Sequence, residues 1–285
     1  MLQTIHDACQ NKVFFQVVNH GISQRVIDDA LGSLSNFFES AMEEKKIFLS
    51  DDVKKPVRFG TSRSNGDAGK VSRDFIKLYA NPIEDWIGLW PHDPTDFREN
   101  VGKYASEVRR LGIDIMGAVT ESLGLSPTYL RNSLEQGMHI LVANTYPQCS
   151  PTSKILGLPP HTDHSIITFL LESTSGLEIM DFTDSSAWKS IPAVKSTLKV
   201  IVGNHLEVLG NGMYKSVFHR ATPSPRLSRV SVASFLSLRM GETVEPAVEL
   251  VDEEHPQKYR ATSLDEFFNH LSSNEERPYI DCLKI

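Results

Sequence analysis

The sequence predicts an α+β fold in which helices come first and a β-rich sandwich or barrel follows. Residues 97–119 place an apolar side chain at every third or fourth position, which is the period of a helix. From residue 138 onward, short β-prone segments alternate with turn residues such as Asn211-Gly212. We expect strands at 139–146, 165–171, 177–181, 198–203, 206–209, 214–220 and 228–236.

Before residue 94, the chain mixes short elements. Residues 13–18 form a β-prone run, and Ser23 precedes apolar residues at helical spacing up to Phe38. Residues 51–70 are polar and glycine-rich, which favours a mobile solvent loop, with a lid over a site as the alternative. Residues 73–80 are expected to be extended.

The remaining helices are predicted from residues that are typical of helix ends. Gly124 follows the long helix, and Ser126-Pro127 has the order that begins another short one. Near the C-terminus, Ser263 and Glu266 have the spacing of a capping box and predict a last helix.

Composition limits the possible partners. The chain has 285 residues and a net charge of −7, which disfavours sequence-independent binding to nucleic acid. No apolar run is long enough to span a membrane, and the first residues lack the features of a signal peptide. The three cysteines lie far apart, which favours reduced thiols and the cytoplasm. Composition therefore gives no support to nucleic acid or a membrane as a partner.

Five polar residues between 161 and 231 form a pattern. If His161 and Asp163 lie on a strand, their side chains leave the same face, and His164 faces the other way. A turn centred on Ser224 would pair two strands and place Arg229 opposite His219. Ser231 would share the face of Arg229.

This set of residue types suits an iron site. A lone His-x-Asp is usually surface chemistry or a satisfied hydrogen bond. Two histidines and one carboxylate, with the rest of the coordination sphere open, are the ligands of non-haem Fe(II) oxygenases. An arginine nearby would bind a carboxylate of a co-substrate through its forked guanidinium. We predict that His161, Asp163 and His219 bind a metal.

The chain resembles the plant 2-oxoglutarate- and Fe(II)-dependent dioxygenases over nearly its full length. The motifs that carry the resemblance are FFQVVNHG at 14–21, NTYPQC at 144–149, GLPPHTD at 157–163, LGNGMYKSVFHRA at 209–221 and RVSVASF at 229–235. The resemblance implies a double-stranded β-helix (jelly-roll) core, Fe(II), 2-oxoglutarate and O2, with ascorbate as a candidate reductant. It also implies a monomer.

The resemblance assigns further roles by position. Arg229 and Ser231 would bind the distal carboxylate of 2-oxoglutarate, assisted by Tyr146, and Asn144 would lie near its keto-acid end. The substrate would contact a wall that includes Phe235, Val142 and Phe75. For Val142 and Phe75, plain core packing is an equal alternative.

Three regions follow from the resemblance, packed as one structural unit. Residues 1–137 would form an N-terminal helical and mixed region, 138–245 the jelly-roll oxygenase core, and 246–285 a C-terminal helical extension. Relatives usually carry a longer segment before FFQVVNHG, so we expect a shortened N-terminus. Ser72-Arg73-Asp74 stands where many relatives have Trp-Arg-Asp, so the substrate side is expected to differ in shape.

We therefore expect an enzyme that hydroxylates or desaturates a small apolar or aromatic plant metabolite, of flavonoid or phenolic type, and releases succinate and CO2. Two alternatives remain open at this point. One is an oxidase of the same fold that does not consume 2-oxoglutarate, similar to aminocyclopropane-carboxylate oxidase. The other is a catalytically silent binding protein, left inactive by the short N-terminus.

Overall fold

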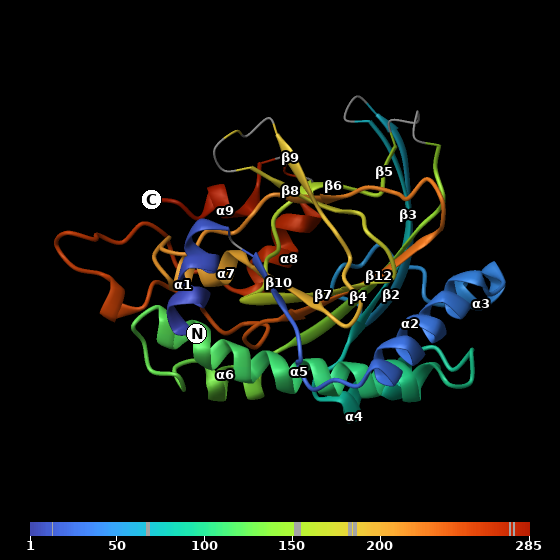
Figure 1. The fold of residues 1–285 in the computed structure, drawn as a ribbon, viewed down its shortest axis with the longest axis horizontal. Coiled ribbons are helices and arrows are strands. Elements are labelled where there is room, and N and C mark those ends of the chain that lie inside the picture. Colours follow the sequence, from blue (N-terminus) through green and yellow to red (C-terminus); the bar gives the residue numbers. More distant parts are fainter. Residues whose placement is uncertain are drawn as a thin grey trace.

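The computed structural model describes residues 1–12, 14–66, 69–150, 155–181, 184, 187–273, 275 and 277–285; for 64–66 and 69–70 it describes only the backbone. The described strands form two curled sheets with helices on the outside (Figure 1), and residues of both sheets line a central space. This architecture is the α+β jelly roll that the sequence predicted.

The helices lie mainly before and after the β-rich part. They are α1 (Leu2–Asn11), α2 (Gln24–Glu39), α3 (Met42–Lys46), α4 (Ile83–Trp86), the 3-10 helix η1 (Ile87–Leu89), α5 (Phe97–Ser122), α6 (Arg131–Glu135), α7 (Asn204–Leu209), the 3-10 helix η2 (Val248–Leu250), α8 (Leu264–Ser272) and α9 (Tyr279–Cys282).

The strands divide between a large and a small sheet. They are β1 (Phe14–Val17), β2 (Val57–Gly66), β3 (Gly69–Tyr79), β4 (His139–Tyr146), β5 (Ile155–Leu156), β6 (Leu158–His161), β7 (Ile167–Glu172), β8 (Leu177–Met180), β9 (Trp188–Ile191), β10 (Leu198–Val202), β11 (His219–Ala221) and β12 (Arg229–Leu236). The large sheet has the order β1-β10-β7-β12-β4-β3-β2, with β5 beside β3, and the small sheet has the order β6-β11-β8-β9.

The long helix α5 supports the large sheet. On its apolar side Phe97, Val101 and Val108 are fully buried and Leu111 and Ile115 partly buried, and α1 and α2 pack beside it (Figure 1). At Gly112 the helix approaches the sheet so closely that an added Cβ would lie 2.2 Å from Leu236 Cδ1. The absence of a side chain there therefore sets the distance between the helix and the sheet.

The predicted helix ends are confirmed at three positions. The Ser23 hydroxyl accepts a hydrogen bond from the Val26 N–H at the start of α2, and the Ser263 hydroxyl accepts one from the Glu266 N–H at the start of α8. Gly124 follows α5 with a φ of +84°, in the left-handed region that glycine adopts most easily.

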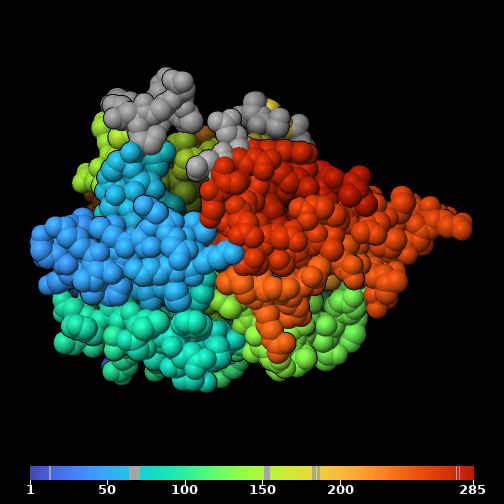
Figure 2. Space-filling model, turned by 180° about the vertical axis from the view of Figure 1, so that it is seen from behind, coloured from blue at the N-terminus to red at the C-terminus, as the bar shows by residue number. Residues whose placement is uncertain are grey.

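The C-terminal segment closes one side of the space between the sheets. Figure 2 shows this segment, in red, beside the hairpin of β2 and β3, in cyan. Lys54 Nζ lies 2.6 Å from Asp265 Oδ1, and the Lys77 ammonium lies 5.3 Å from the ring centroid of Phe268. These two contacts hold helix α8 against the part of the large sheet formed by β2 and β3.

The prediction of a loop at residues 51–70 is wrong over most of that range. Residues from Val57 onward form β2, paired with β3 in a register that joins Val57 to Leu78; residues 67–68 lie outside the described residues. Strand β2 is the last strand of the large sheet, and Thr61 and Arg63 on it are exposed. Polar side chains are stable in such a strand, so its composition resembled a loop.

Three further boundaries differ from the prediction. The run at 206–209 belongs to helix α7 and not to a strand, because a short run that is buried on all sides has no period to separate the two. The strand expected at 214–220 is confined to β11, at His219–Ala221. The helix expected from Ser126 begins only at Arg131.

The pairing expected between the strands of His219 and Arg229 is also wrong. Strand β11 pairs with β6 and β8 in the small sheet, whereas β12 pairs with β4 and β7 in the large one. The connection between them therefore crosses from one sheet to the other. Each strand already has a partner on both sides, so neither has a free edge for the other.

In the part of the chain that the structure describes, no helix combines the length and apolar character needed to cross a bilayer.

Candidate active site

The three residues predicted to bind a metal lie together at one end of the central space. His161 is the last residue of β6 and pairs directly with His219, the first residue of β11. Asp163 lies beyond the end of β6, in the loop that follows, so it is not on a strand as expected. The Asp163 carboxylate nevertheless turns back: its Oδ1 is 3.7 Å from His161 Nε2 and 3.5 Å from His219 Nε2.

Backbone carbonyl groups orient both imidazole rings. His161 Nδ1 lies 2.8 Å from the Pro159 carbonyl oxygen, and His219 Nδ1 lies 3.1 Å from that of Val217. In the tautomer that protonates Nδ1, each ring donates this hydrogen bond and leaves the Nε2 lone pair free. Burial and the neighbouring charge of His219 hold the pKa of His161 below its ordinary value, which favours the neutral, metal-binding form.

The donor set fits one divalent metal ion. The ligand atoms of His161, Asp163 and His219 all lie within 4.8 Å of one another. Asp163 is 4 % exposed, and its Oδ2 has no hydrogen-bond partner among the described residues. A buried carboxylate oxygen without a partner is costly unless a cation neutralises it. Two imidazoles and one carboxylate are the set expected for a ferrous ion with open positions.

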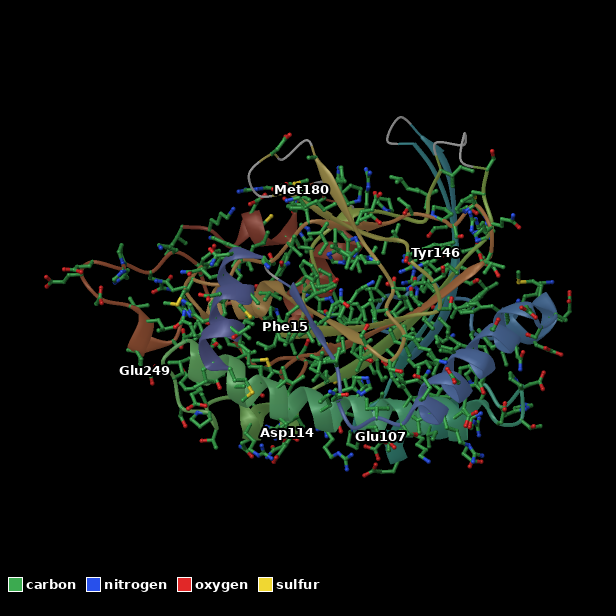
Figure 3. All side chains as sticks on the ribbon, viewed as in Figure 1. Phe15, Glu107, Asp114, Tyr146, Met180 and Glu249 are labelled. Atoms are coloured by element: carbon green, nitrogen blue, oxygen red, sulfur yellow. The ribbon has the colours of Figure 1, made fainter. Side chains whose placement is uncertain are left out.

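The four residues predicted to hold 2-oxoglutarate lie on neighbouring strands. In the register of β12 against β4, Arg229 pairs with Tyr146 and Ser231 pairs with Asn144. All four are buried, and the Arg229 guanidinium carbon lies 4.9 Å from the centroid of the Tyr146 ring. Figure 3 places Tyr146 among the strands, whereas Glu107 and Asp114 lie on α5 at the edge of the molecule.

Sequence analysis missed the residues that fix Arg229. Its Nη2 donates to Glu172 Oε2 at 2.7 Å and its Nε donates to the Thr174 carbonyl at 3.1 Å. Glu172 also pairs with Lys199 of β10. Arg229 Nη1 is buried and has no hydrogen-bond partner in the described part of the chain, while the guanidinium also interacts with the Tyr146 side chain. The sequence did offer one indication of a buried ion pair here, since Lys199 interrupts the apolar run of residues 198–202.

A cavity of about 500 Å³ extends from the three metal-site residues. Its lining includes Phe75, Val142 and Phe235, as predicted for the substrate wall, and also two aromatic rings of α8 that were not predicted, Phe267 and Phe268. Aromatic rings from the large sheet and from α8 therefore form part of the cavity wall.

His164 lines the same cavity instead of facing away from it. Its ring stacks on Phe267 at 4.3 Å and on Phe235 at 5.1 Å, measured between centroids. Strand β6 ends at His161, so the alternation of faces no longer applies at residue 164.

Comparison with known proteins identifies the family. Residues 137–238 match the model of the 2OG-Fe(II) oxygenase superfamily, and residues 1–93 match that of the non-haem dioxygenase in morphine synthesis N-terminal. The chain is 45 % identical to 2-oxoglutarate-dependent dioxygenase 21, chloroplastic, of Oryza sativa subsp. japonica, over 98 % of this chain and 84 % of that protein. It belongs to the 2-oxoglutarate- and Fe(II)-dependent oxygenases.

Other members of the superfamily support the same assignment. Flavanone 3-dioxygenase 3 of Oryza sativa subsp. japonica is 41 % identical over all of this chain and 87 % of that protein. The solved structure of JOX2 in complex with 2OG, Fe and JA superposes with a TM-score of 0.90 at 25 % identity, over all of this chain and 85 % of that one. The rice dioxygenase for auxin oxidation, at 24 % identity, shares the fold with a TM-score of 0.82 over all of this chain and 94 % of that one.

The chain is therefore an oxidoreductase that uses Fe(II), 2-oxoglutarate and O2, as predicted. The same-fold oxidase that does not consume 2-oxoglutarate is not favoured by these relatives, which are named as 2-oxoglutarate-dependent or flavanone dioxygenases.

Proposed function

We propose that His161, Asp163 and His219 bind the ferrous ion of a dioxygenase that hydroxylates or desaturates a small aromatic plant metabolite of flavonoid or phenolic type. The observation that carries this proposal is the set of three ligand atoms within 4.8 Å of one another, with Asp163 Oδ2 buried and lacking a partner among the described residues. When bound, the ion supplies the activation of O2, coupled to the conversion of 2-oxoglutarate into succinate and CO2.

The protein's part is to orient the ligands and the co-substrate. The carbonyl groups of Pro159 and Val217 keep both imidazole rings turned toward Asp163, which organises the site before the metal arrives. Arg229 then binds the distal carboxylate of 2-oxoglutarate. Its free Nη1 supports this role, because the other side of the guanidinium is already held by Glu172.

Three other residues complete the co-substrate site in this proposal. Ser231 and Tyr146 lie beside Arg229 through the β12–β4 register and assist at the distal carboxylate. Asn144, opposite Ser231, lies toward the keto-acid end. Ser231, Tyr146 and Asn144 are all buried, so water competes little for their hydrogen bonds.

The substrate occupies the aromatic part of the cavity in this proposal. Phe235, Phe75 and Val142 form its wall on the large sheet, and the rings of α8 close the opposite side. Such a wall positions a flat ring so that one C–H bond faces the iron site, and it excludes water from the reacting atoms. The identity with flavanone 3-dioxygenase 3 supports a flavonoid-type substrate.

The test measures O2 uptake and succinate release together. With Fe(II), 2-oxoglutarate and ascorbate as reductant, a flavanone or simpler phenolic substrate should raise both in equal amounts. An ascorbate-dependent reaction without succinate would support the alternative oxidase. Failure of the folded protein to bind close to one equivalent of Fe(II) would support the silent binding protein.

The assembly and location are proposals of the same kind. We propose a monomer that acts on a small molecule in the cytoplasm and binds no nucleic acid. The rice relative named as chloroplastic makes the chloroplast the competing location. Size-exclusion chromatography with light scattering tests the first point, and imaging of a fluorescent fusion of the full-length gene product tests the second.

A further inference from the structure

Arg73 is a cation of the cavity wall that pairs with no acidic side chain among the described residues. Arg73 lines the cavity from β3, and its Nε is buried without a hydrogen-bond partner in the described residues. Its Nη1 donates to Asn144 Oδ1 at 3.0 Å, and it interacts with the hydroxyl of Tyr146. Both contacts are to neutral groups. Within the described ranges, Arg73 forms no ion pair.

Other arginines in the wall have acidic neighbours. Arg229 pairs with Glu172 at 2.7 Å, and Arg220 pairs with Glu178 at 2.6 Å. Arg58 interacts with the charges of two nearby aspartates, Asp51 and Asp52. Arg73 differs from them in this respect.

The strand geometry aims Arg73 at the cavity. Side chains at 73, 75 and 77 of β3 leave the same face, and all three line the cavity. Two guanidinium groups lie near the Phe75 ring, with Arg73 Cζ at 4.9 Å and Arg58 Cζ at 5.2 Å from its centroid. Gly60 faces Phe75 across the hairpin, and a Cβ there would lie 2.6 Å from the ring. The space left by Gly60 therefore lets the ring take this position.

Charge balance shows what Arg73 lacks. At the co-substrate end, Glu172 offsets one of the two cations that contact it. In the proposed complex, 2-oxoglutarate and Asp163 offset the other cation and the ferrous ion. Arg73 remains as a positive charge in a partly desolvated wall, which is unfavourable unless an anion binds there. Lys77, on the same face of β3, also forms no ion pair with a described residue, but its ammonium donates to the Val53 carbonyl oxygen.

We propose that Arg73 binds a carboxylate of the substrate, so that the substrate is an aromatic acid whose ring lies against Phe75. This inference rests on the proposed function and narrows its substrate class. The forked guanidinium forms two parallel hydrogen bonds with a carboxylate, which fixes both the position and the orientation of the ring. Arg73 is thus a specificity-determining residue on the substrate side of the site.

The test compares acids with neutral molecules of the same shape. The probes are naphthalene-2-carboxylate and naphthalene-2-carboxamide, together with 3-phenylpropanoate and its primary amide. Each is titrated anaerobically into the enzyme loaded with Fe(II) and 2-oxoglutarate, and binding is followed by the shift of the metal-to-ligand charge-transfer band and by thermal stabilisation. At least one acid should bind about 10-fold or more tightly than its amide, as expected for a charged hydrogen bond.

Substitutions then locate the effect. Arg73→Gln should weaken the acid by about 10- to 100-fold, to the level of its amide, and leave the amide unchanged. Arg73→Lys should retain part of the preference for the acid, because it keeps the charge but not the fork. The control is Arg131→Gln, which removes an exposed arginine on α6 that pairs with Asp114 and Glu135, and should change neither affinity.

Three outcomes would overturn the proposal: no acid binding in either probe pair, amides that bind as tightly as the acids, or an Arg73→Gln variant that weakens 2-oxoglutarate instead of the acid. The last would place Arg73 in the co-substrate site. Failure of the proposed function is a separate result: the wild type would then release no succinate with any metabolite, while thermal stabilisation could still show acid binding that depends on Arg73.

Discussion

Replacing Glu172 with glutamine tests the buried charge cluster behind the co-substrate site. Glu172 is 4 % exposed and pairs with both Arg229 and Lys199, which are 1 % and 2 % exposed. The substitution leaves the Arg229 cation without its anion, beside the Lys199 amine, whose pKa is lowered to about 7 by burial and by the charge of Arg229. Removal of one partner from a buried ion pair costs about 3–5 kcal/mol. A charge pair 4 Å apart at an effective dielectric constant of 20 gives a similar figure, about 4 kcal/mol.

The assay is urea unfolding at pH 7.5, followed by circular dichroism. With a denaturant slope of about 3 kcal/mol/M, Glu172→Gln should lower the unfolding midpoint by about 1–1.5 M. Adding Lys199→Met replaces the buried, partly charged amine with an apolar side chain and should restore part of the loss. Saturating 2-oxoglutarate should also stabilise the single variant more than the wild type, because its carboxylate supplies the missing negative charge.

The matched control is Glu178→Gln. Glu178 also pairs with an arginine, Arg220, at 2.6 Å, but the two side chains are 21 % and 25 % exposed. The loss there should be below about 1 kcal/mol, since solvent screens the pair. Equal losses for the two glutamine variants, or a Glu172→Gln/Lys199→Met variant no more stable than Glu172→Gln, would refute the reasoning.

Three further predictions concern the metal, the co-substrate and pH. His219→Ala removes a proposed iron ligand and should lower Fe(II) affinity by more than about 100-fold, measured by titration; stoichiometric binding in the variant would exclude His219 as a ligand. Arg229→Lys should raise the KM for 2-oxoglutarate about 10- to 100-fold with a smaller change in kcat, because an ammonium lacks the fork; an unchanged KM would contradict the assignment. Burial lowers the pKa of His139 and His205 to about 3, so the folded protein stays unprotonated there while the unfolded chain takes up protons below pH 6.5. These two histidines should therefore contribute about 4 kcal/mol to the fall in stability from pH 7.5 to 5.0, and the double variant with glutamine at both positions should lose that part of the dependence, while His161 and His164, whose pKa values are also lowered, keep theirs; an unchanged slope in the variant would contradict the assignment.

The sequence by itself determined the reaction class and the residue types of the site. His161, Asp163 and His219 could be singled out because few chemistries need two imidazoles and one carboxylate together, and their neighbours matched a known family. The helix caps at Ser23 and Ser263 were predictable for a related reason, since each depends on hydrogen bonds within one turn. The boundaries between the three regions, at 137/138 and 245/246, stay predictions.

The tertiary structure decided how distant strands share one cavity. Local pattern placed His219 and Arg229 on paired strands, but the chain changes sheets between them, and only the competition among all strand edges determines that. The same applies to Lys199, Glu172 and Arg73, whose charges seemed unremarkable along the chain. Whether each of these charges is stable depends on the opposite charges that the fold brings near it. A buried charge is costly when it is unpaired and tolerable when it is paired.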